Sequence, residues 1–366
     1  MNRERLGILI NDRLLAGIRK GRSGHEKIAF YEQAGQAYGL TPCFFTLRDI
    51  SLKKKRVKAF VQVKGKWKRK AFSLPSVIHN RAIFHSKAHW RRSKQLVQHG
   101  VDLFNFWNRY SKWQIHQLLA EQKTFVPHLP ATAVLNEDAL QEMMGRFDSL
   151  FLKPDKGTVG KGIIKLDKQD DAEKRQWTAS YRNKGKLVTA RLKEEQLYQK
   201  LTRFTKHHAF LIQQTIPLAT YEGAPFDLRV SAQKGGDGQW GITGMIGKAA
   251  RPGHFLSNVA QGGQVFALEQ LLTEYPRLSV QKVSRNVSEL ALAMAKYLAE
   301  QLPHLADVGF DFGINEQGHP YFIEMNGRDQ RYSFQQGGQP DTWKATYEQP
   351  VAYAKFLLEQ KKVNDG

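Results

Sequence analysis

"FLKPDKGTVGKG", residues 151–162, is an apolar segment that runs into three lysines and three glycines. The glycines let backbone N–H groups approach phosphate oxygens, so the stretch is typical of a phosphate-binding loop. It nevertheless fits neither common phosphate motif. The P-loop requires a glycine where Asp155 stands and a Ser or Thr where Gly162 stands, and the dinucleotide fingerprint requires a glycine where Val159 stands.

The segments on either side of this loop predict a β-hairpin. Residues 150–154, "LFLKP", read as a strand that enters the loop, and residues 162–167, "GIIKLD", read as its partner. In a P-loop the segment after the glycines must be a helix. The sequence therefore favours a glycine-rich hairpin of another nucleotide-binding design.

Composition predicts a cytoplasmic protein, and the alternation of strands with helices along the chain predicts an α/β (α+β) fold. A length of 366 residues corresponds to two or three domains, and a hydrophobic content of 41% is enough to build their cores. The single cysteine, Cys43, excludes an intramolecular disulfide and indicates a reducing compartment. The apolar run Leu6–Ile10 is too short for a signal peptide or a membrane span, so neither is expected.

The chain is strongly basic, with 56 Lys and Arg against 34 Asp and Glu, a net charge of +22. Part of the excess lies in residues Lys53–Lys70, where the alternating segment 57–63 and the glycine turn at Gly65 predict a basic hairpin. One interpretation is a solvated edge that resists aggregation, and the other is a docking site for an anionic partner. No helix-turn-helix, zinc-finger or RNP pattern accompanies it, so sequence-specific binding of nucleic acid is not expected.

Two domains are expected. Residues 1–105 alternate strands with helices, which predicts a small unit with a mainly parallel sheet. Residues 106–360 form the second domain, divided near residue 210, and begin with a helix at 111–122 that Ser111 caps. Residues 167–210 are polar and give no clear assignment.

Three oxygen-bearing side chains are predicted to converge in a hairpin at residues 307–326. Val308, Phe310, Phe312 and Ile314 share one face of its first strand and leave Asp311 on the other. On the returning strand Tyr321, Ile323 and Met325 share a face and leave Glu324 and Asn326 opposite. Two carboxylates and an amide oxygen suit Mg²⁺, although unrelated polar residues on a hydrated sheet face would show the same pattern.

The order of these features along the chain resembles the ATP-grasp ligases over residues 105 to about 345, preceded by a unit similar to their pre-ATP-grasp domain. The segments "FNFWNRYSKW", "FDLRV", "SNVAQGG" and "YFIEMN" are most similar to the spore-coat-associated YheC/YheD-type branch. The same skeleton is also similar to ligases that add glutamate to protein tails.

The resemblance implies a role for each candidate site residue. For ATP the implied residues are Lys112, Lys153, Gly157, Gly160, Lys161 and Gly162 at the phosphates, Gln213, Gln214 and Ile216 at adenine, and Asp227 at the ribose. Arg229, Lys248 and Asn258 would line the region of phosphoryl transfer, and Asp311, Glu324 and Asn326 would hold two Mg²⁺ ions. Asn80, Arg81 and Arg328 would face the acceptor.

The implied activity is an ATP- and Mg²⁺-dependent ligase that joins a carboxylate to an amine or thiol through an acyl-phosphate, in a spore coat or cell envelope. Substrates in reach are amino acids, acidic peptides or an acidic polymer. The alternative is a non-catalytic coat scaffold that retains the ligase fold and binds an anionic partner. The chain has a complete set of residues suited to bind phosphate and metal. A scaffold would not need that set, so its presence favours the enzyme.

Overall fold

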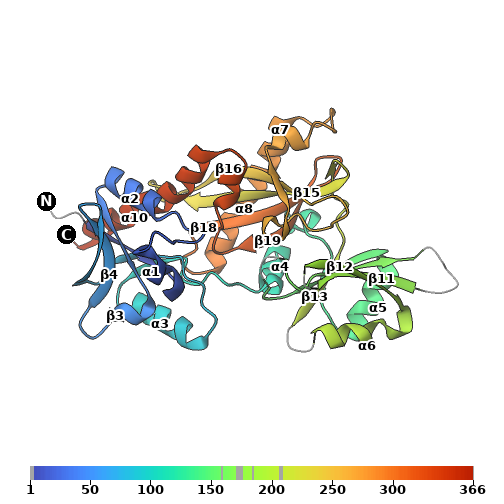
Figure 1. The fold of residues 1–366 in the computed structure, drawn as a ribbon, viewed down its shortest axis with the longest axis horizontal. Coiled ribbons are helices and arrows are strands. Elements are labelled where there is room, and N and C mark those ends of the chain that lie inside the picture. Colours follow the sequence, from blue (N-terminus) through green and yellow to red (C-terminus); the bar gives the residue numbers. More distant parts are fainter. Residues whose placement is uncertain (1–3, 158–159, 170–175, 184, 206–208, 366) are drawn as a thin grey trace.

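Three β-sheets follow one another along the long axis of the molecule (Figure 1). The computed structural model describes residues 4–157, 160–169, 176–183, 185–205 and 209–365. The sheet built from the N-terminal strands lies at one end, the sheet of residues 132–214 lies at the other, and the sheet of residues 220–326 lies between them.

The N-terminal sheet has the order β3-β4-β2-β1-β6-β7, with β5 paired to β4. Its strands are β1 (Glu4–Leu9), β2 (Leu40–Phe45), β3 (Ile50–Ser51), β4 (Arg56–Val63), β5 (Lys66–Ser73), β6 (Val77–Asn80) and β7 (Asp102–Phe104). Strands β2, β1, β6 and β7 pair in parallel, which confirms the predicted parallel sheet. Helices α1 (Asp12–Ile18), α2 (Ile28–Ala37) and α3 (Lys87–Gln98) belong to the same unit.

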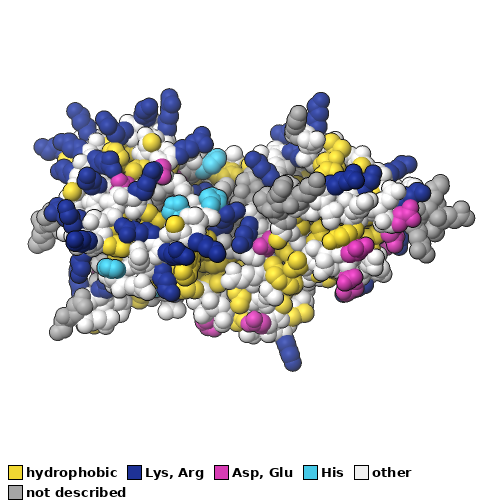
Figure 2. Space-filling view, turned by 90° about the horizontal axis from the view of Figure 1, so that it is seen from below, with side chains coloured by type: hydrophobic (Ala, Val, Ile, Leu, Met, Phe, Trp, Pro, Cys, Tyr) yellow, Lys and Arg dark blue, Asp and Glu magenta, His cyan; other side chains and the backbone are white. Residues whose placement is uncertain are grey.

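The basic hairpin is confirmed as β4 and β5, which pair antiparallel across a turn where Gly65 has a φ of 74°. The side chains of Lys66, Lys68 and Lys70 are exposed along β5. Figure 2 shows Lys and Arg side chains gathered over this end of the molecule, whereas most of the Asp and Glu in that view lie elsewhere.

The sheet at the other end has the order β12-β11-β10-β9-β13-β8, and all of its neighbours are antiparallel. Its elements are β8 (Thr132–Val134), α5 (Glu137–Arg146), β9 (Ser149–Pro154), β10 (Ile164–Lys168), β11 (Gln176–Asn183), β12 (Lys186–Lys193), α6 (Glu194–Thr205) and β13 (Phe210–Gln214). The predicted hairpin around the glycine loop is confirmed, because Leu152 of β9 is opposite Ile164 of β10. Residues 167–210, which have no clear assignment from the sequence, contain the hairpin β11–β12 and helix α6.

The middle sheet carries the largest apolar core. Its elements are β14 (Thr220–Tyr221), β15 (Ala224–Lys234), β16 (Trp240–Ala249), β17 (Gln264–Phe266), α7 (Leu268–Leu271), α8 (Val280–Gln301), β18 (Asp307–Ile314) and β19 (Pro320–Asn326). Phe310, Phe312 and Met294 are fully buried between this sheet and α8. Helix α4 (Lys112–Ala120), which Ser111 caps as predicted, adds Ile115 and Leu119 to the same core.

The C-terminal helix α10 (Pro340–Asp365) follows the short helix α9 (Tyr332–Gln336) and packs against the N-terminal sheet. Trp343, Tyr347 and Val351 share a core with Leu6 and Tyr31. The division into two domains at residue 105 stays a prediction. Helix α10, which that division assigns to the second domain, completes the core of the first. Among the described residues no helix is both long and apolar enough to cross a lipid bilayer.

The prediction that Tyr321, Ile323 and Met325 share one face of β19 is wrong in part. The pairing with β18 shifts by one residue between Asp311 and Phe312, which is a β-bulge. Phe322 and Met325 therefore both pack against the apolar core and border one part of the pocket described below, while the consecutive residues Ile323 and Glu324 both line its two parts. The bulge breaks the strict alternation that the prediction assumed.

Candidate active site

A pocket opens between the end sheet of residues 132–214 and the middle sheet, and it has two connected parts. The loop compartment lies at the glycine loop and is lined by Phe151, Gly160, Lys161, Ile163, Asp227 and Asp311, among others. The arginine compartment is lined by Arg109, Arg229, Arg328 and Asn326, among others. Lys112, Lys153, Lys248, Asn258 and Glu324 line both, so they stand where the two parts meet.

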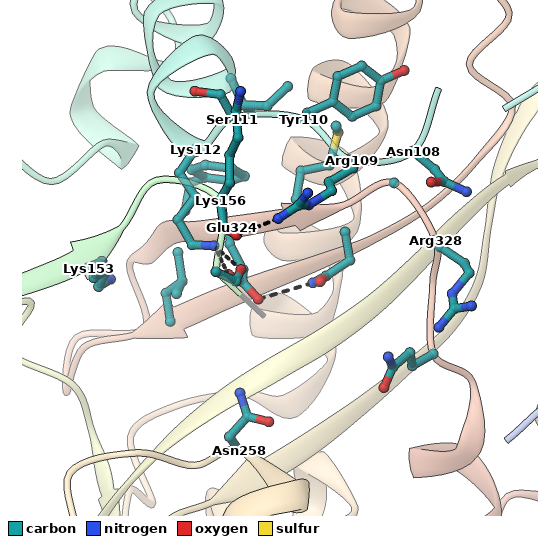
Figure 3. A pocket seen from close by; sticks show the side chains of 18 of the residues that line it. Asn108, Arg109, Tyr110, Ser111, Lys112, Lys153, Lys156, Asn258, Glu324 and Arg328 are labelled. Carbon is teal, nitrogen blue, oxygen red and sulfur yellow. Dashed lines mark hydrogen bonds and ion pairs between the residues drawn. The ribbon is translucent and has the colours of Figure 1, made fainter. Parts of the chain in front are cut away.

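The three predicted metal ligands lie side by side on β18 and β19. Asp311 is directly opposite Glu324 in the register, and Asn326 Nδ2 donates to Asp311 Oδ2 at 3.2 Å and to Glu324 Oε1 at 3.4 Å. Figure 3 shows Glu324 pointing between Lys112 and Asn258. The structure therefore brings these three side chains together.

Asp311 is held by two cations. Arg229 donates through Nε to Asp311 Oδ1 at 2.8 Å and through Nη2 to Oδ2 at 3.1 Å, and Lys248 Nζ lies 2.7 Å from Oδ1. Burial by itself raises the pKa of Asp311, but the charges of Arg229 and Lys248 outweigh it and hold that pKa well below its usual range. Asp311 is thus a fixed carboxylate anion.

Asp227 belongs to the same cluster. Lys248 Nζ lies 2.7 Å from Asp227 Oδ1, and Ser257 Oγ donates to the other oxygen. Burial and the nearby Asp311 charge raise the pKa of Asp227, although Lys248 acts against that shift. The contact with Lys248 sets Asp227 beside the metal candidates, and its role at the ribose stays a prediction.

Lys153 stands on the wall of the pocket, at the end of β9. Its Nζ donates to Gln213 Oε1, and no carboxylate among the described residues lies within ion-pair distance. Burial lowers the pKa of Lys153 to about 8; the charge of Glu324 acts against that shift, and the charge of Lys112 adds to it. Such a poorly compensated ammonium is suited to a phosphate ligand.

Helix α4 and the glycine loop are tied together through Asp155, which the sequence analysis did not single out. Asp155 Oδ1 accepts from Ser111 Oγ at 2.6 Å and from Trp113 N at 3.0 Å, and its carbonyl accepts from Lys112 N at 3.1 Å. Lys112 Nζ then lies 3.0 Å from the carbonyl oxygen of Gly157 and 3.1 Å from Glu324 Oε2. The only sequence signal for Asp155 was its place inside the quoted loop.

The predicted loop glycines take two conformations. Gly160 and Gly162 have positive φ values of 65° and 75°, at which a residue with a side chain would be strained, whereas Gly157 does not have a positive φ. Gly157, Gly160 and the exposed Lys161 line the pocket, and residues 158–159 of the predicted loop lie outside the described residues.

The loop compartment has an apolar wall formed by Phe151, Ile163, Ile216, Leu218, Phe255 and Leu256. Gln213 and Gln214 lie at its edge on β13, and Gln214 Oε1 accepts from Ala131 N at 3.3 Å. A flat heteroaromatic base fits such a wall, because ligand pockets pair apolar surface with few polar groups. That adenine binds at residues 213–216 stays a prediction.

The predicted acceptor residues divide into two kinds. Arg328 lines the arginine compartment, on the opposite side of the pocket from Lys153 in Figure 3. Asn80 and Arg81 do not line it: Asn80 donates to the carbonyl of Asn105 at 3.0 Å, and Arg81 donates to Glu26 at 2.7 Å. Both side chains are buried and act inside the protein.

Within the described part of the chain, no group of three His, Cys, Asp or Glu side chains is placed to hold a metal ion. The candidate site has two carboxylates and one amide instead. These donors fit Mg²⁺, which binds through one or two carboxylates and fills its other positions with water and substrate phosphate. Asp311, Glu324 and Asn326 are the residues that would hold it.

Comparison with known proteins identifies the family. A family model described as YheC/D-like ATP-grasp matches residues 85–357. The endospore coat-associated protein YheD of Bacillus subtilis (strain 168) is 28% identical over 344 residues, which cover 91% of this chain and 73% of YheD. The endospore coat-associated protein YheC of the same strain is 22% identical over 334 residues, which cover 88% of this chain and 90% of YheC.

A solved structure supports the fold. The VanG D-Ala:D-Ser ligase of Enterococcus faecalis superimposes with a TM-score of 0.56 at 9% identity, and the match covers 96% of this chain and 100% of VanG. At that identity the likeness establishes the ATP-grasp fold alone. The family model matches most of the length of this chain, so the chain belongs to the YheC/D-like ATP-grasp family.

Proposed function

We propose that the protein is an ATP- and Mg²⁺-dependent ligase that joins a carboxylate to an amine or thiol. The observation that carries the proposal is the row Asp311, Glu324 and Asn326, which faces the cations Lys112, Lys153 and Lys248 within one pocket. Metal-binding oxygens opposite phosphate-binding cations are what phosphoryl transfer from ATP requires.

The reaction has two steps in this proposal. An oxygen of the substrate carboxylate attacks the γ-phosphorus of ATP, the bond to the bridging oxygen of ADP breaks, and an acyl-phosphate forms. The amine or thiol then attacks the acyl carbon, phosphate leaves, and the nucleophile loses its proton. Bound Mg²⁺ would offset the charge of the phosphate oxygens.

The residues of the chain contribute position and charge in this scheme. Lys112, Lys153 and the glycine loop hold the phosphates, and Arg229, Lys248 and Asn258 surround the transferred group. Two Mg²⁺ ions are proposed at Asp311, Glu324 and Asn326. Each cation acts by charge stabilisation, so no nucleophilic side chain is needed.

The named relatives give the proposal a cellular setting. YheC and YheD are described as endospore coat-associated, so we infer that this protein acts on a component of a spore coat or cell envelope. Its composition supports a cytoplasmic localisation. Candidate substrates are amino acids, acidic peptides and acidic polymers.

A coat scaffold without catalytic activity is the second candidate. The exposed lysines of the hairpin Lys53–Lys70 favour it, since they offer a positive surface to an anionic polymer at the end of the molecule opposite the sheet of residues 132–214 (Figure 1). Binding through this surface would weaken steeply as salt concentration rises.

Release of ADP separates the two candidates. The full-length protein with Mg·ATP should form ADP only when a suitable carboxylate and amine are both supplied from a panel of amino acids, acidic peptides and polyglutamate. Lys248→Met should abolish that turnover, whereas Lys344→Met, which removes an exposed lysine of α10, should not. No ADP release across the whole panel would favour the scaffold.

A further inference from the structure

The arginine compartment carries a large excess of positive charge. Its described lining includes seven basic side chains, Arg109, Lys112, Lys153, Lys156, Arg229, Lys248 and Arg328, and one acidic side chain, Glu324. Three of the basic groups already have carboxylate partners. Lys112 pairs with Glu324, Arg229 pairs with Asp311 and Asp329, and Lys248 pairs with Asp227 and Asp311.

Arg328 differs from these three because it has no carboxylate partner among the residues that the structure describes. Its Nη1 donates to the carbonyl oxygen of Arg81 at 3.3 Å. Its Nε is buried and has no hydrogen-bond partner within the same part of the chain. A buried donor without an acceptor is uncommon in folded proteins and indicates that a ligand or water supplies the acceptor.

The surroundings hold Arg328 in place. The preceding residue, Gly327, packs so closely on Asn108 that a Cβ there would lie 2.8 Å from the Asn108 carbonyl oxygen. Asn108 is itself anchored, because its Nδ2 donates to the carbonyl of Ala82 at 2.7 Å. Arg81, whose carbonyl oxygen accepts from Nη1, is itself held by Glu26, which accepts from Arg81 Nη2 at 2.7 Å. The guanidinium is therefore positioned before any ligand arrives.

Other free cations of the compartment are placed differently. Arg109 Nη2 donates to the carbonyl of Lys156 at 3.1 Å, which sets this pair at the start of the glycine loop. Lys153 is also on the loop side, across the pocket from Arg328 in Figure 3. The triphosphate of ATP belongs on that side, so Arg328 is left for another anion.

We propose that the Nε–Nη2 edge of Arg328 binds a carboxylate that one of the two substrates carries in addition to its reacting group. This inference rests on the proposed ligase function. A guanidinium presents two parallel N–H donors that match the two oxygens of a carboxylate, and the single charge of Arg328 balances one carboxylate. The substrate is then either a dicarboxylic acid or an amine that bears a carboxylate, such as an amino acid or a peptide C-terminus.

Binding of small probes to the full-length protein tests the inference without turnover. The probes are alanine against alaninamide, and glutarate against glutaramate, each titrated in the presence and absence of Mg²⁺ and a non-hydrolysable ATP analogue. Within each pair only one carboxylate becomes an amide. The pair that shows the difference identifies which substrate carries the extra carboxylate.

In the wild-type protein, at least one carboxylate probe should bind more tightly than its amide. Arg328→Gln should remove that preference by weakening the carboxylate probe roughly ten- to hundredfold. The ATP analogue should bind this variant as it binds the wild type, which shows that the pocket is folded. Arg285→Gln, which removes an exposed arginine of α8, is the matched control and should keep the preference.

Two outcomes overturn the inference. One is a wild type that does not prefer the carboxylate member of either pair, and the other is an Arg328→Gln variant that keeps the preference. A different result would show that the proposed ligase function fails. In that case the ATP analogue does not bind the wild type at all, while titrations without the analogue still show a carboxylate preference that depends on Arg328.

Discussion

The two carboxylates at the centre of the pocket differ in how tightly the protein has already balanced their charge. Asp311 is bound by Arg229, Lys248 and Asn326, and it is nearly inaccessible to solvent. Among the residues that the structure describes, Glu324 has one ion pair, with Lys112, and both partners are partly exposed. A pair of that kind contributes little to stability, so Glu324 can exchange Lys112 for a metal ion at small cost.

This difference leads to a prediction for Glu324→Gln. Mg·ATP should raise the melting temperature of the wild type, and it should not raise that of the variant, because the amide lacks the charge that holds Mg²⁺. Without ligand the melting temperatures of the two proteins should nearly coincide. Thermal unfolding with and without Mg·ATP measures both, and Glu316→Gln, an exposed site in the turn before β19, is the control. An undiminished rise in Glu324→Gln would contradict the metal assignment.

Lys153 supports a prediction about pH. Burial holds its pKa at about 8 in the free protein, and a bound phosphate would raise that pKa by stabilising the ammonium. ATP should therefore bind less tightly as pH rises above about 8, and binding near that pH should take up a fraction of a proton. Calorimetry in buffers of different ionisation enthalpy measures this uptake.

The matched variant for that experiment is Lys153→Arg, because arginine stays protonated throughout this range. In this variant the side chain at position 153 should keep its positive charge but should no longer contribute to proton uptake. Equal uptake by Lys153→Arg and the wild type would show that another group titrates on binding.

At the scale of elements, the link between α4 and the glycine loop depends on one side chain. Asp155 accepts two hydrogen bonds from residues 111 and 113 through its carboxylate. Asp155→Ala should cost about 1 kcal/mol of stability, as loss of a helix-terminal acceptor does, and should weaken ATP binding several-fold because Lys112 and Gly157 are no longer held together. Equilibrium unfolding and ATP titration measure the two effects.

Asn136→Ala separates the two effects. Asn136 caps α5 by accepting from Ala139 N at 2.7 Å, away from the pocket. It should lose a similar amount of stability and keep full ATP affinity. If both variants bind ATP like the wild type, the Asp155 link has no role in nucleotide binding.

The elements that the sequence predicted correctly are those whose signal is local. The glycine hairpin β9–β10 lies within residues 149–168 and the Asp311 strand β18 within residues 307–314, so each shows its pattern in one short continuous segment. The bulge opposite Asp311 was missed, because an extra residue in one strand has no composition signal and reverses the alternation beyond it. Helix α6 and the hairpin β11–β12 were missed because their exposed faces are polar.

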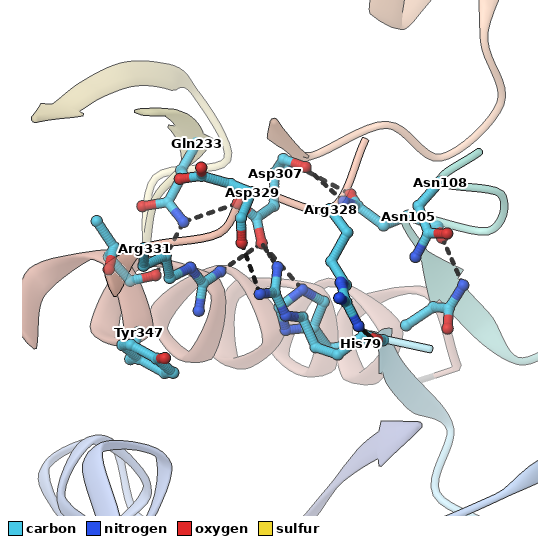
Figure 4. Close-up of polar contacts among 12 residues, drawn as sticks. His79, Asn105, Asn108, Gln233, Asp307, Arg328, Asp329, Arg331 and Tyr347 are labelled. Carbon is cyan, nitrogen blue, oxygen red and sulfur yellow. Dashed lines mark hydrogen bonds and ion pairs between the residues drawn. The ribbon is translucent and has the colours of Figure 1, made fainter. Parts of the chain in front are cut away.

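At the scale of the whole molecule, a buried polar network joins the N-terminal sheet to the middle sheet (Figure 4). Arg81 lies next to Glu26 of the N-terminal unit, and it also donates to Asp307 at 3.3 Å and to the carbonyl of Asp329 at 2.7 Å. Arg331 adds a further ion pair to Asp307. The network reaches the pocket, since Asp329 also binds Arg229 at 3.1 Å.

The sequence could not show this network, because its members are up to about three hundred residues apart and each alone resembles a surface charge. Arg81 is the clearest case. Its position beside Asn80 suggested an acceptor-binding pair, whereas the structure uses its guanidinium to balance Glu26 and Asp307 between two units. Only the packing of α10 and β18 on the N-terminal sheet shows which role it has.

The network predicts that Arg81→Met lowers stability by about 3–5 kcal/mol, because Glu26 and Asp307 lose a partner that burial does not let water replace. Calorimetric unfolding should show the loss as a lower melting temperature. Glu26→Gln in the Arg81→Met background should recover part of it by removing one unpaired charge. Arg48→Met, which breaks the exposed pair with Asp12, should leave stability nearly unchanged. If Arg81→Met costs as little as Arg48→Met, the network does not hold the two units together.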